Sequence, residues 1–285
     1  MFLAAFGLFI SLLSAVLWQS SNNSKETLLT CPRLSFDQVI ARSFTSPLSN
    51  MNLAKFKDVT AFVLGYTGGA GKEIARLLLE RDLFKTVVLI GRREVDYKDE
   101  PTFQKAKQVV VDFENIDQHE SAFQGATIGF CALGCRPAVD GVAGVQRVDH
   151  DYVVNSAKIA KKMGCSHFCL VSATGSDVNS WFEISRIKGH TEEDVKAIGF
   201  DRLTIAKPKI ITGKETRPWT QKFLDCAAKP IDLLKPGWMA VSAASIGKAL
   251  INDVFEKDGE TGYLAIYDNA QLNKQAKTFD QHFKE

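Results

Sequence analysis

Three glycines spaced Gly-x-x-Gly-x-x-Gly form the part of the sequence best suited to bind a phosphate: Gly65, Gly68 and Gly71. They follow an apolar run at residues 59–64, typical of a strand buried on both faces, and precede a stretch with helical periodicity at 73–79. Between a strand and a helix, such glycines permit a tight turn, close approach of a pyrophosphate and close packing of the helix. The phosphate then meets free N–H groups at the positive end of the helix dipole. The loop predicts a dinucleotide site, although a tight turn in an unrelated α/β domain has the same spacing.

Two arginines follow the second predicted strand. The apolar run at 86–90 ends in Gly91, Arg92 and Arg93. An NAD site places an acidic residue near this strand end to hold the ribose 2′-hydroxyl. Two guanidinium groups occur there instead, and an arginine fork matches a phosphate with two parallel hydrogen bonds. The pattern favours NADP(H) over NAD(H), and the alternative is that both arginines are solvated loop cations.

Residues at the ends of two further apolar runs complete the predicted cofactor site, together with Thr67 of the glycine loop. The run at 108–111 is followed by Asp112 and Phe113, which are expected at the edge of the adenine ring. The run at 127–134 ends in Leu133 and Gly134, beside the expected cofactor.

The elements that position these residues alternate along the chain between strands and helices. Further strands are predicted at 167–172 and 202–206, and helices at 145–163 and 181–198. Six or seven strands in such alternation mean parallel βαβ units. The expected fold is therefore α/β, a Rossmann-type doubly wound parallel sheet with a small C-terminal cap region.

The dinucleotide-binding domain is expected to span residues 58–268, followed by a C-terminal tail at 269–285. The cap segment near 213–238 is rich in aromatic and aliphatic residues. That composition fits either a small helical cap that buries its own core or an apolar ligand site. Residues 19–57 hold no long periodic pattern and are interpreted as a linker.

Residues 1–18 form a separate apolar segment without a charged residue. As a helix they would span ~27 Å, just enough for the hydrocarbon core of a bilayer. Lys25, Arg33 and Arg42 all follow the segment, which favours the C-terminal domain on the cytosolic side. The prediction is a cytoplasmic protein anchored on the endoplasmic reticulum, the nuclear envelope or the mitochondrial outer membrane. A cleaved signal peptide and an incidental extension are the alternatives.

Composition excludes several other classes of protein. The 285 residues carry 35 Lys and Arg against 33 Asp and Glu, a net charge of +2, which does not suggest direct binding of nucleic acid. Six cysteines are too few for a disulfide scaffold at this length, and those in apolar runs are interpreted as buried, reduced thiols. No metal site is expected.

Several motifs together resemble the Tat-interactive-protein-like branch of the atypical short-chain dehydrogenase/reductase superfamily. The resemblance covers roughly residues 57–255 and is carried by Phe62-Val63-Leu64-Gly65-x-x-Gly68-x-x-Gly71, Leu89-Ile90-Gly91-Arg92-Arg93, Val110-Val111-Asp112-Phe113-Glu114, Ser121-Ala122-Phe123-Gln124-Gly125, Gly129-Phe130-Cys131-x-Leu133-Gly134 and Val148-Asp149-x-Asp151-Tyr152-Val153.

The resemblance implies a catalytic Ser, Tyr and Lys, of which this chain has two. Ser172 matches the serine that polarises the substrate carbonyl, and Lys188 matches the lysine that holds the nicotinamide ribose. The tyrosine position is Ile184, which has no ionisable proton, so the usual proton relay cannot operate. Pro208 matches a proline that the superfamily places beside the nicotinamide.

Two functions of different classes follow from these features. The first is an NADPH-binding regulatory protein with weak or absent reductase activity. By resemblance, it would act through partners such as nuclear transport receptors, in nuclear import, transcription or cell death. The second is an active NADPH-dependent reductase of a small hydrophobic carbonyl substrate at a membrane surface, which the apolar segment 1–18 and the aromatic cap segment favour.

Overall fold

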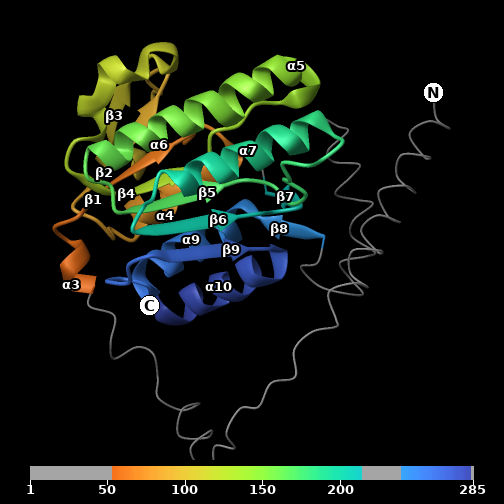
Figure 1. Ribbon diagram of the computed structural model, residues 1–285. Coiled ribbons are helices and arrows are strands. Elements are labelled where there is room, and N and C mark those ends of the chain that lie inside the picture. The colour runs from red at the N-terminus through yellow and green to blue at the C-terminus, as the bar shows by residue number, and fades with distance from the viewer. Residues whose placement is uncertain (1–52, 214–238, 284–285) are drawn as a thin grey trace, which may run out of the picture. The chain divides into compact units, whose positions relative to one another are not determined.

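Seven parallel strands form the central sheet of the computed structural model, which describes residues 53–213 and 239–283. Their order is β3-β2-β1-β4-β5-β6-β9, so the chain starts in the middle, moves outward to β3 and returns past β1 to β4 (Figure 1). The strands are β1 (Thr60–Leu64), β2 (Thr86–Gly91), β3 (Lys107–Val110), β4 (Ala126–Cys131), β5 (His167–Val171), β6 (Arg202–Ala206) and β9 (Tyr263–Tyr267). The predicted doubly wound Rossmann-type sheet is confirmed. Strands β7 (Ile210–Thr212) and β8 (Ala240–Ser242) form a separate parallel pair.

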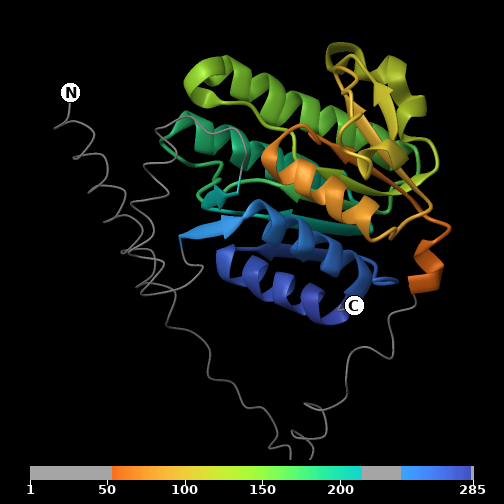
Figure 2. The ribbon, with the colours of Figure 1, turned by 180° about the vertical axis from the view of Figure 1, so that it is seen from behind.

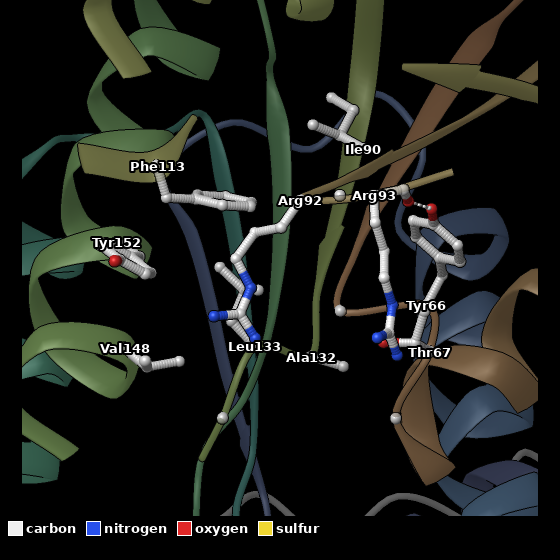
Figure 3. Close-up of a pocket in the computed structure, with 14 residues that line it drawn as sticks. Tyr66, Thr67, Ile90, Arg92, Arg93, Phe113, Ala132, Leu133, Val148 and Tyr152 are labelled. Carbon is white, nitrogen blue, oxygen red and sulfur yellow. Dashed lines mark hydrogen bonds between the residues drawn. The ribbon is translucent and has the colours of Figure 1, made fainter. Parts of the chain in front are cut away.

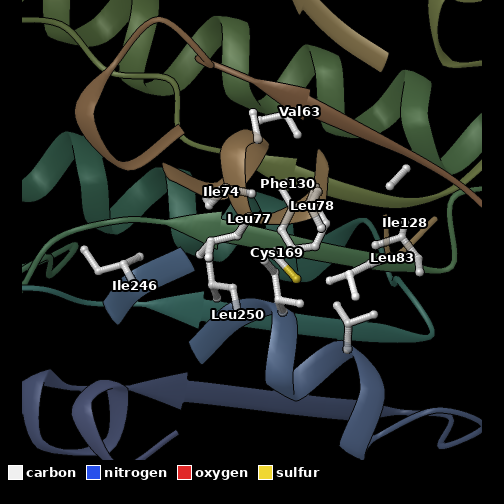
Figure 4. Packing of buried hydrophobic residues seen from close by; sticks show 14 of the residues in the cluster. Val63, Ile74, Leu77, Leu78, Leu83, Ile128, Phe130, Cys169, Ile246 and Leu250 are labelled. Atoms are coloured by element: carbon white, nitrogen blue, oxygen red, sulfur yellow. The ribbon is translucent and has the colours of Figure 1, made fainter. Parts of the chain in front are cut away.

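Three helices cover one face of the sheet: α4 (Gly69–Glu80), α9 (Ala243–Glu256) and α10 (Asn269–His282) (Figures 1 and 2). Leucines and isoleucines of α4 and α9 pack on Val63 and Phe130 of the two central strands, and all of these side chains are fully buried (Figure 4). This layer fixes α4 against the sheet, and the N-terminus of α4 is where the glycine loop ends.

The other face is covered by irregular and regular helices, which Figure 1 shows above the sheet. They are η3 (Phe113–Phe123), α5 (Pro137–Val145), η4 (Gln146–Tyr152), α6 (Val153–Lys162) and α7 (Glu183–Ala197), and the short η2 (Phe103–Lys105) precedes β3. The helical segment predicted at 145–163 begins earlier in the structure, at Pro137. A π-helical turn, η4, joins α5 to α6. Aromatic rings fill this core: Phe62 meets Phe123 edge to face, with ring centroids 5.1 Å apart.

The C-terminal part of the chain differs from the expectation of a tail at 269–285. Residues 269–282 form α10, whose Leu272 and Phe279 are fully buried. Asp268 begins the helix with a capping box, because its carboxylate accepts the Gln271 N–H while the Gln271 side chain accepts the Asp268 N–H. Residues 269–282 therefore belong to the domain. So does Phe56 on α3 (Leu53–Phe56), expected in the linker, since its ring packs 4.4 Å from that of Phe255.

A buried carboxylate joins the edge strand β9 to β6 and α9. Asp253 is fully buried and accepts hydrogen bonds from the hydroxyls of Tyr263, Tyr267 and Thr204. Thr204 in turn accepts from His167 Nε2 at 2.9 Å, and burial lowers the pKa of His167 to about 3, so its ring is neutral. Three hydroxyl donors satisfy a group that would otherwise be costly to bury.

Four of the six cysteines lie in the described residues, and all four are free thiols. Cys131, Cys165 and Cys169 are buried, which confirms the interpretation for these three, whereas Cys135 is half-buried. Burial raises the pKa of Cys131 and of Cys165 to about 12, so both thiols stay protonated at neutral pH.

Several expectations concern residues outside the described ranges. They are the apolar segment 1–18, the linker up to residue 52 and the cap segment from residue 214 to 238. Within residues 53–213 and 239–283, no helix is both long enough and apolar enough to cross a membrane.

Candidate cofactor site

The glycine loop turns from β1 into α4 through two close backbone contacts. Gly65 has a φ of +76°, and a Cβ there would lie 2.4 Å from the carbonyl oxygen of Ala132 on the neighbouring chain segment. A Cβ on Gly71 would lie 2.2 Å from the carbonyl oxygen of Gly65. Both positions therefore require glycine: a side chain at Gly65 would meet the backbone that follows β4, and one at Gly71 would push the helix away from the end of β1. The role predicted for Gly71 is structural, and the structure does not place it in the cavity lining.

The N-terminus of α4 is left open toward solvent. Its N-cap is Gly68, which has no side chain to accept a hydrogen bond from the first turn, and no acidic residue lies in that turn. The first N–H groups of the helix are thus free of side-chain caps and carry the positive end of the helix dipole. This arrangement fits the pyrophosphate of a dinucleotide.

A cavity of about 450 Å³ lies over this loop, between the ends of β1, β2 and β4 (Figure 3). It occupies the point where the sheet order reverses, the usual ligand position in doubly wound sheets. Most residues predicted to bind the cofactor line it: Gly65, Thr67, Gly68, Arg92, Arg93, Phe113, Leu133 and Gly134. Six further residues that were not predicted also line it: Tyr66, Ile90, Gly91, Ala132, Val148 and Tyr152.

Two guanidinium groups reach into the cavity from the end of β2. Arg92 and Arg93 are exposed, and both side chains extend into the site in Figure 3. Among the described residues, no carboxylate forms an ion pair with either of them. The cavity therefore has two cations available to an anionic ligand.

A flat aromatic wall closes the side opposite the glycine loop. The rings of Phe113 and Tyr152 stack with centroids 5.2 Å apart and an interplanar angle of 24°. Tyr152 donates to a carboxylate oxygen of Glu114, and burial together with this carboxylate raises the pKa of its phenol. The wall is suited to a planar base such as adenine.

Asp112 was predicted beside Phe113 at the edge of the adenine ring, but it does not line the cavity. Its side chain is exposed, accepts from the Glu114 N–H at 3.0 Å and from Asn115 Nδ2 at 2.8 Å, and so caps η3. An aspartate before a helical turn more readily bonds to the free N–H groups next to it than to a ligand.

The residues predicted for the nicotinamide end do not line the cavity, and two of them are engaged by buried carboxylates. Lys188 Nζ lies 2.6 Å from Asp149 Oδ2, and Asp149 Oδ1 accepts the Cys135 N–H at 2.8 Å. Ser172 Oγ donates to Glu192 Oε1 at 2.5 Å. The same Glu192 forms a 2.9 Å ion pair with Lys207.

Ile184 and Pro208 also lie outside the cavity lining. Ile184 is half-buried one turn before Lys188 on α7, so an aliphatic side chain occupies the place of the expected proton donor. Pro208 is buried, and its carbonyl accepts the Thr174 N–H at 2.9 Å. Neither side chain has a proton to supply.

Some of the six unpredicted lining residues could have been found from the sequence. Ile90, Gly91 and Ala132 are at the carboxyl ends of strands, where ligands bind in this fold. Val148 and Tyr152 are four residues apart, which places both on one helical face. Tyr66 could not be found in this way, because its role depends on a contact with the backbone that follows β2.

Fold and site together define a Rossmann-fold dinucleotide-binding protein. A family model described as NAD(P)H-binding matches residues 65–230. Rat HTATIP2 is 34% identical over 233 residues, which cover 79% of this chain and 93% of that protein. A protein of Aspergillus niger named "Protein fmp52, mitochondrial" is 33% identical, covering 67% of this chain and 84% of that protein. The chain belongs to this NAD(P)H-binding, atypical short-chain dehydrogenase/reductase-like family, as the motifs indicated.

Solved structures share the fold at low sequence identity. UDP-glucose 4-epimerase from Thermotoga maritima matches with a TM-score of 0.56 and 14% identity, over 80% of this chain and 84% of that one. A putative NAD-dependent epimerase/dehydratase from Bacillus halodurans matches with a TM-score of 0.55 and 16% identity, over 77% and 99%. At these identities, the likeness concerns the fold alone.

Proposed function

We propose that this protein binds NADPH in preference to NADH. The observation that carries the proposal is that Arg92 and Arg93 line the cavity at the end of β2 and form no ion pair with any carboxylate of the described residues. The two cofactors differ only in the 2′-phosphate of the adenosine ribose, and this strand end is where that ribose binds in the fold. In such a complex, the glycine loop would hold the pyrophosphate and the Phe113 ring would face the adenine.

The second part of the proposal is that turnover is weak or absent. Bound NADPH supplies a hydride, but a carbonyl substrate also needs a proton, and Ile184 has none to give. The two residues that match the family's catalytic lysine and serine already have partners. Lys188 forms an ion pair with Asp149, and Ser172 donates a hydrogen bond to Glu192. Lys188 retains hydrogen-bonding capacity toward ribose hydroxyls, so its pairing does not oppose cofactor binding.

The third part is a regulatory role through protein partners, with nuclear transport receptors as the class that the family resemblance suggests. An exposed aromatic pair supports a protein-binding surface: Trp181 is 97% exposed and Phe182 is 62% exposed, just before α7. Tryptophan is enriched among residues that dominate binding energy at interfaces. Lys188, which matches the lysine that holds the nicotinamide ribose, is on α7, directly after this aromatic pair. Cofactor binding and partner binding would therefore involve the same helix.

The first test concerns the cofactor. Replacing both Arg92 and Arg93 by Ala should weaken NADPH binding by at least ~10-fold, because each charge-assisted contact contributes about 1.5–3 kcal/mol. NADH binding should hardly change. Arg147→Ala is the matched control, since this arginine is exposed nearby but does not line the cavity. Titration by intrinsic fluorescence measures both affinities, and an equal loss for both cofactors would refute the 2′-phosphate assignment.

The second test concerns turnover. The wild type should consume NADPH slowly or not at all with a panel of carbonyl compounds, whereas Ile184→Tyr should be faster, because a phenol adds general acid catalysis worth about 10²–10⁴-fold. Ser185→Tyr is the control, since its side chain points about 100° away around the helix. Absorbance at the nicotinamide band measures the rate. Wild-type turnover that Lys188→Ala abolishes would instead support the alternative, an active reductase of a hydrophobic carbonyl at a membrane surface.

The third test concerns partners. A purified nuclear transport receptor should bind the wild-type chain with an affinity that changes when NADPH is added, and Trp181→Ala should reduce that affinity about 10-fold or more. Val110→Ala, on the edge strand β3 and 52% exposed, should leave it unchanged. Surface plasmon resonance supplies the affinities, and an affinity indifferent to both NADPH and Trp181 would contradict the regulatory proposal.

The fourth test concerns anchoring on the cytosolic face of a membrane, which we propose from the sequence of residues 1–18. Deleting these residues should move the protein from the membrane to the supernatant of fractionated cells, because the segment is just long enough to span a bilayer. Cofactor affinity should not change. Full-length protein found in the supernatant would count against an anchor.

A further inference from the structure

The loop that carries the two arginines is held in place by side chains from two other segments. Tyr66 of the glycine loop donates its hydroxyl to the carbonyl oxygen of Arg93 at 3.0 Å (Figure 3). Gln108 of β3 donates Nε2 to the Val95 carbonyl at 2.9 Å and accepts the Val95 N–H at 3.0 Å. Three hydrogen bonds therefore fix the backbone of residues 93–95.

Tyr66 fits its position closely. Its side chain is 2% exposed and belongs to the buried cluster on the α4 face of the sheet. Its ring passes against Gly91, where a Cβ would lie 2.8 Å from Tyr66 Cε1. The tyrosine thus starts in the loop that fits the pyrophosphate, crosses the end of β2 and ends at the backbone of the arginine loop.

Fixing this backbone matters more for arginine than for a simple charge. A guanidinium binds a phosphate best when two of its N–H groups are aligned with two oxygens. The side chain is long, so a small rotation at the Arg93 carbonyl becomes a large displacement at its end. A loop held in advance also loses less conformational entropy when the ligand binds.

We propose that Tyr66 is a positioning residue for cofactor specificity: its hydroxyl, assisted by Gln108, fixes the Arg93 backbone so that the arginines meet a ribose 2′-phosphate. The inference rests on the proposed function and deepens it. Tyr66 itself needs no contact with the 2′-phosphate, since it acts through Arg93. The adenine, the pyrophosphate and the nicotinamide are common to both cofactors and do not depend on this bond.

The test separates the hydroxyl from the ring. Tyr66→Phe keeps the buried ring and removes the hydroxyl, with its bond to the Arg93 carbonyl and its longer 3.4 Å contact with Gln108 Oε1. NADPH affinity should then fall about 3–10-fold while NADH affinity stays within about 2-fold. The ratio of the two dissociation constants is the readout, because general loosening of the loop would weaken both cofactors alike. Gln108→Leu removes the two bonds to Val95 and should shift the ratio in the same direction.

Tyr97→Phe is the matched control. Tyr97 belongs to the same buried cluster and stacks on Phe103 with centroids 4.6 Å apart, but among the described residues its hydroxyl has no hydrogen-bond partner. The ratio should not change in this variant. If the wild type prefers NADPH and both Tyr66→Phe and Gln108→Leu keep that preference, the role of Tyr66 is refuted and the cofactor assignment survives. If the wild type binds both cofactors equally, the cofactor assignment fails and this inference fails with it.

Discussion

The whole site depends on one close backbone contact, the approach of Gly71 to the carbonyl of Gly65. That contact brings the first turn of α4 directly onto the end of β1, and the apolar layer beneath α4 holds it there. Because β1 lies between β2 and β4 in the sheet, the loop that follows it borders both neighbouring strand ends. The arginines at the end of β2 and the segment after β4 are therefore brought to one cavity by topology rather than by sequence proximity.

Charge is distributed unevenly between the two ends of the site. At the adenosine end, Arg92 and Arg93 have no carboxylate partner among the described residues. At the expected nicotinamide end, Lys188 and Lys207 are each paired with a buried carboxylate. Free cations attract and hold an anionic ligand, whereas a lysine paired with a carboxylate has little net charge to offer a reacting group. This arrangement supports the proposal that the protein binds its cofactor with weak or absent turnover.

Sequence patterns were sufficient where a segment is buried on both faces. The runs at β1, β2, β5 and β6 are mainly apolar and were placed within a residue or so of their observed ends. The edge strand β9 was not predicted although its sequence is apolar, and it is buried on one face only, since Leu264 and Ile266 face solvent at 50% and 42% exposure. The helix α10 was missed for a related reason: it is mainly polar, and its few buried residues have meaning only against α9. Asp112 and Tyr66 depended on local capping and on a neighbouring strand, which single-sequence spacing does not encode.

In this chain, the features that define the fold and the side chains that decide its chemistry belong to different parts of the structure. The overall fold is shared with solved epimerase and epimerase/dehydratase structures at 14% and 16% identity, and a shared fold does not by itself fix the chemistry. What distinguishes this chain lies in a few side chains above the sheet. At the position where the family resemblance places a phenol, this chain has the half-buried sec-butyl side chain of Ile184, which packs as an apolar group but has no proton to donate. A Rossmann domain can therefore lose its reaction while keeping its ligand, because packing energy and proton transfer reside in different atoms.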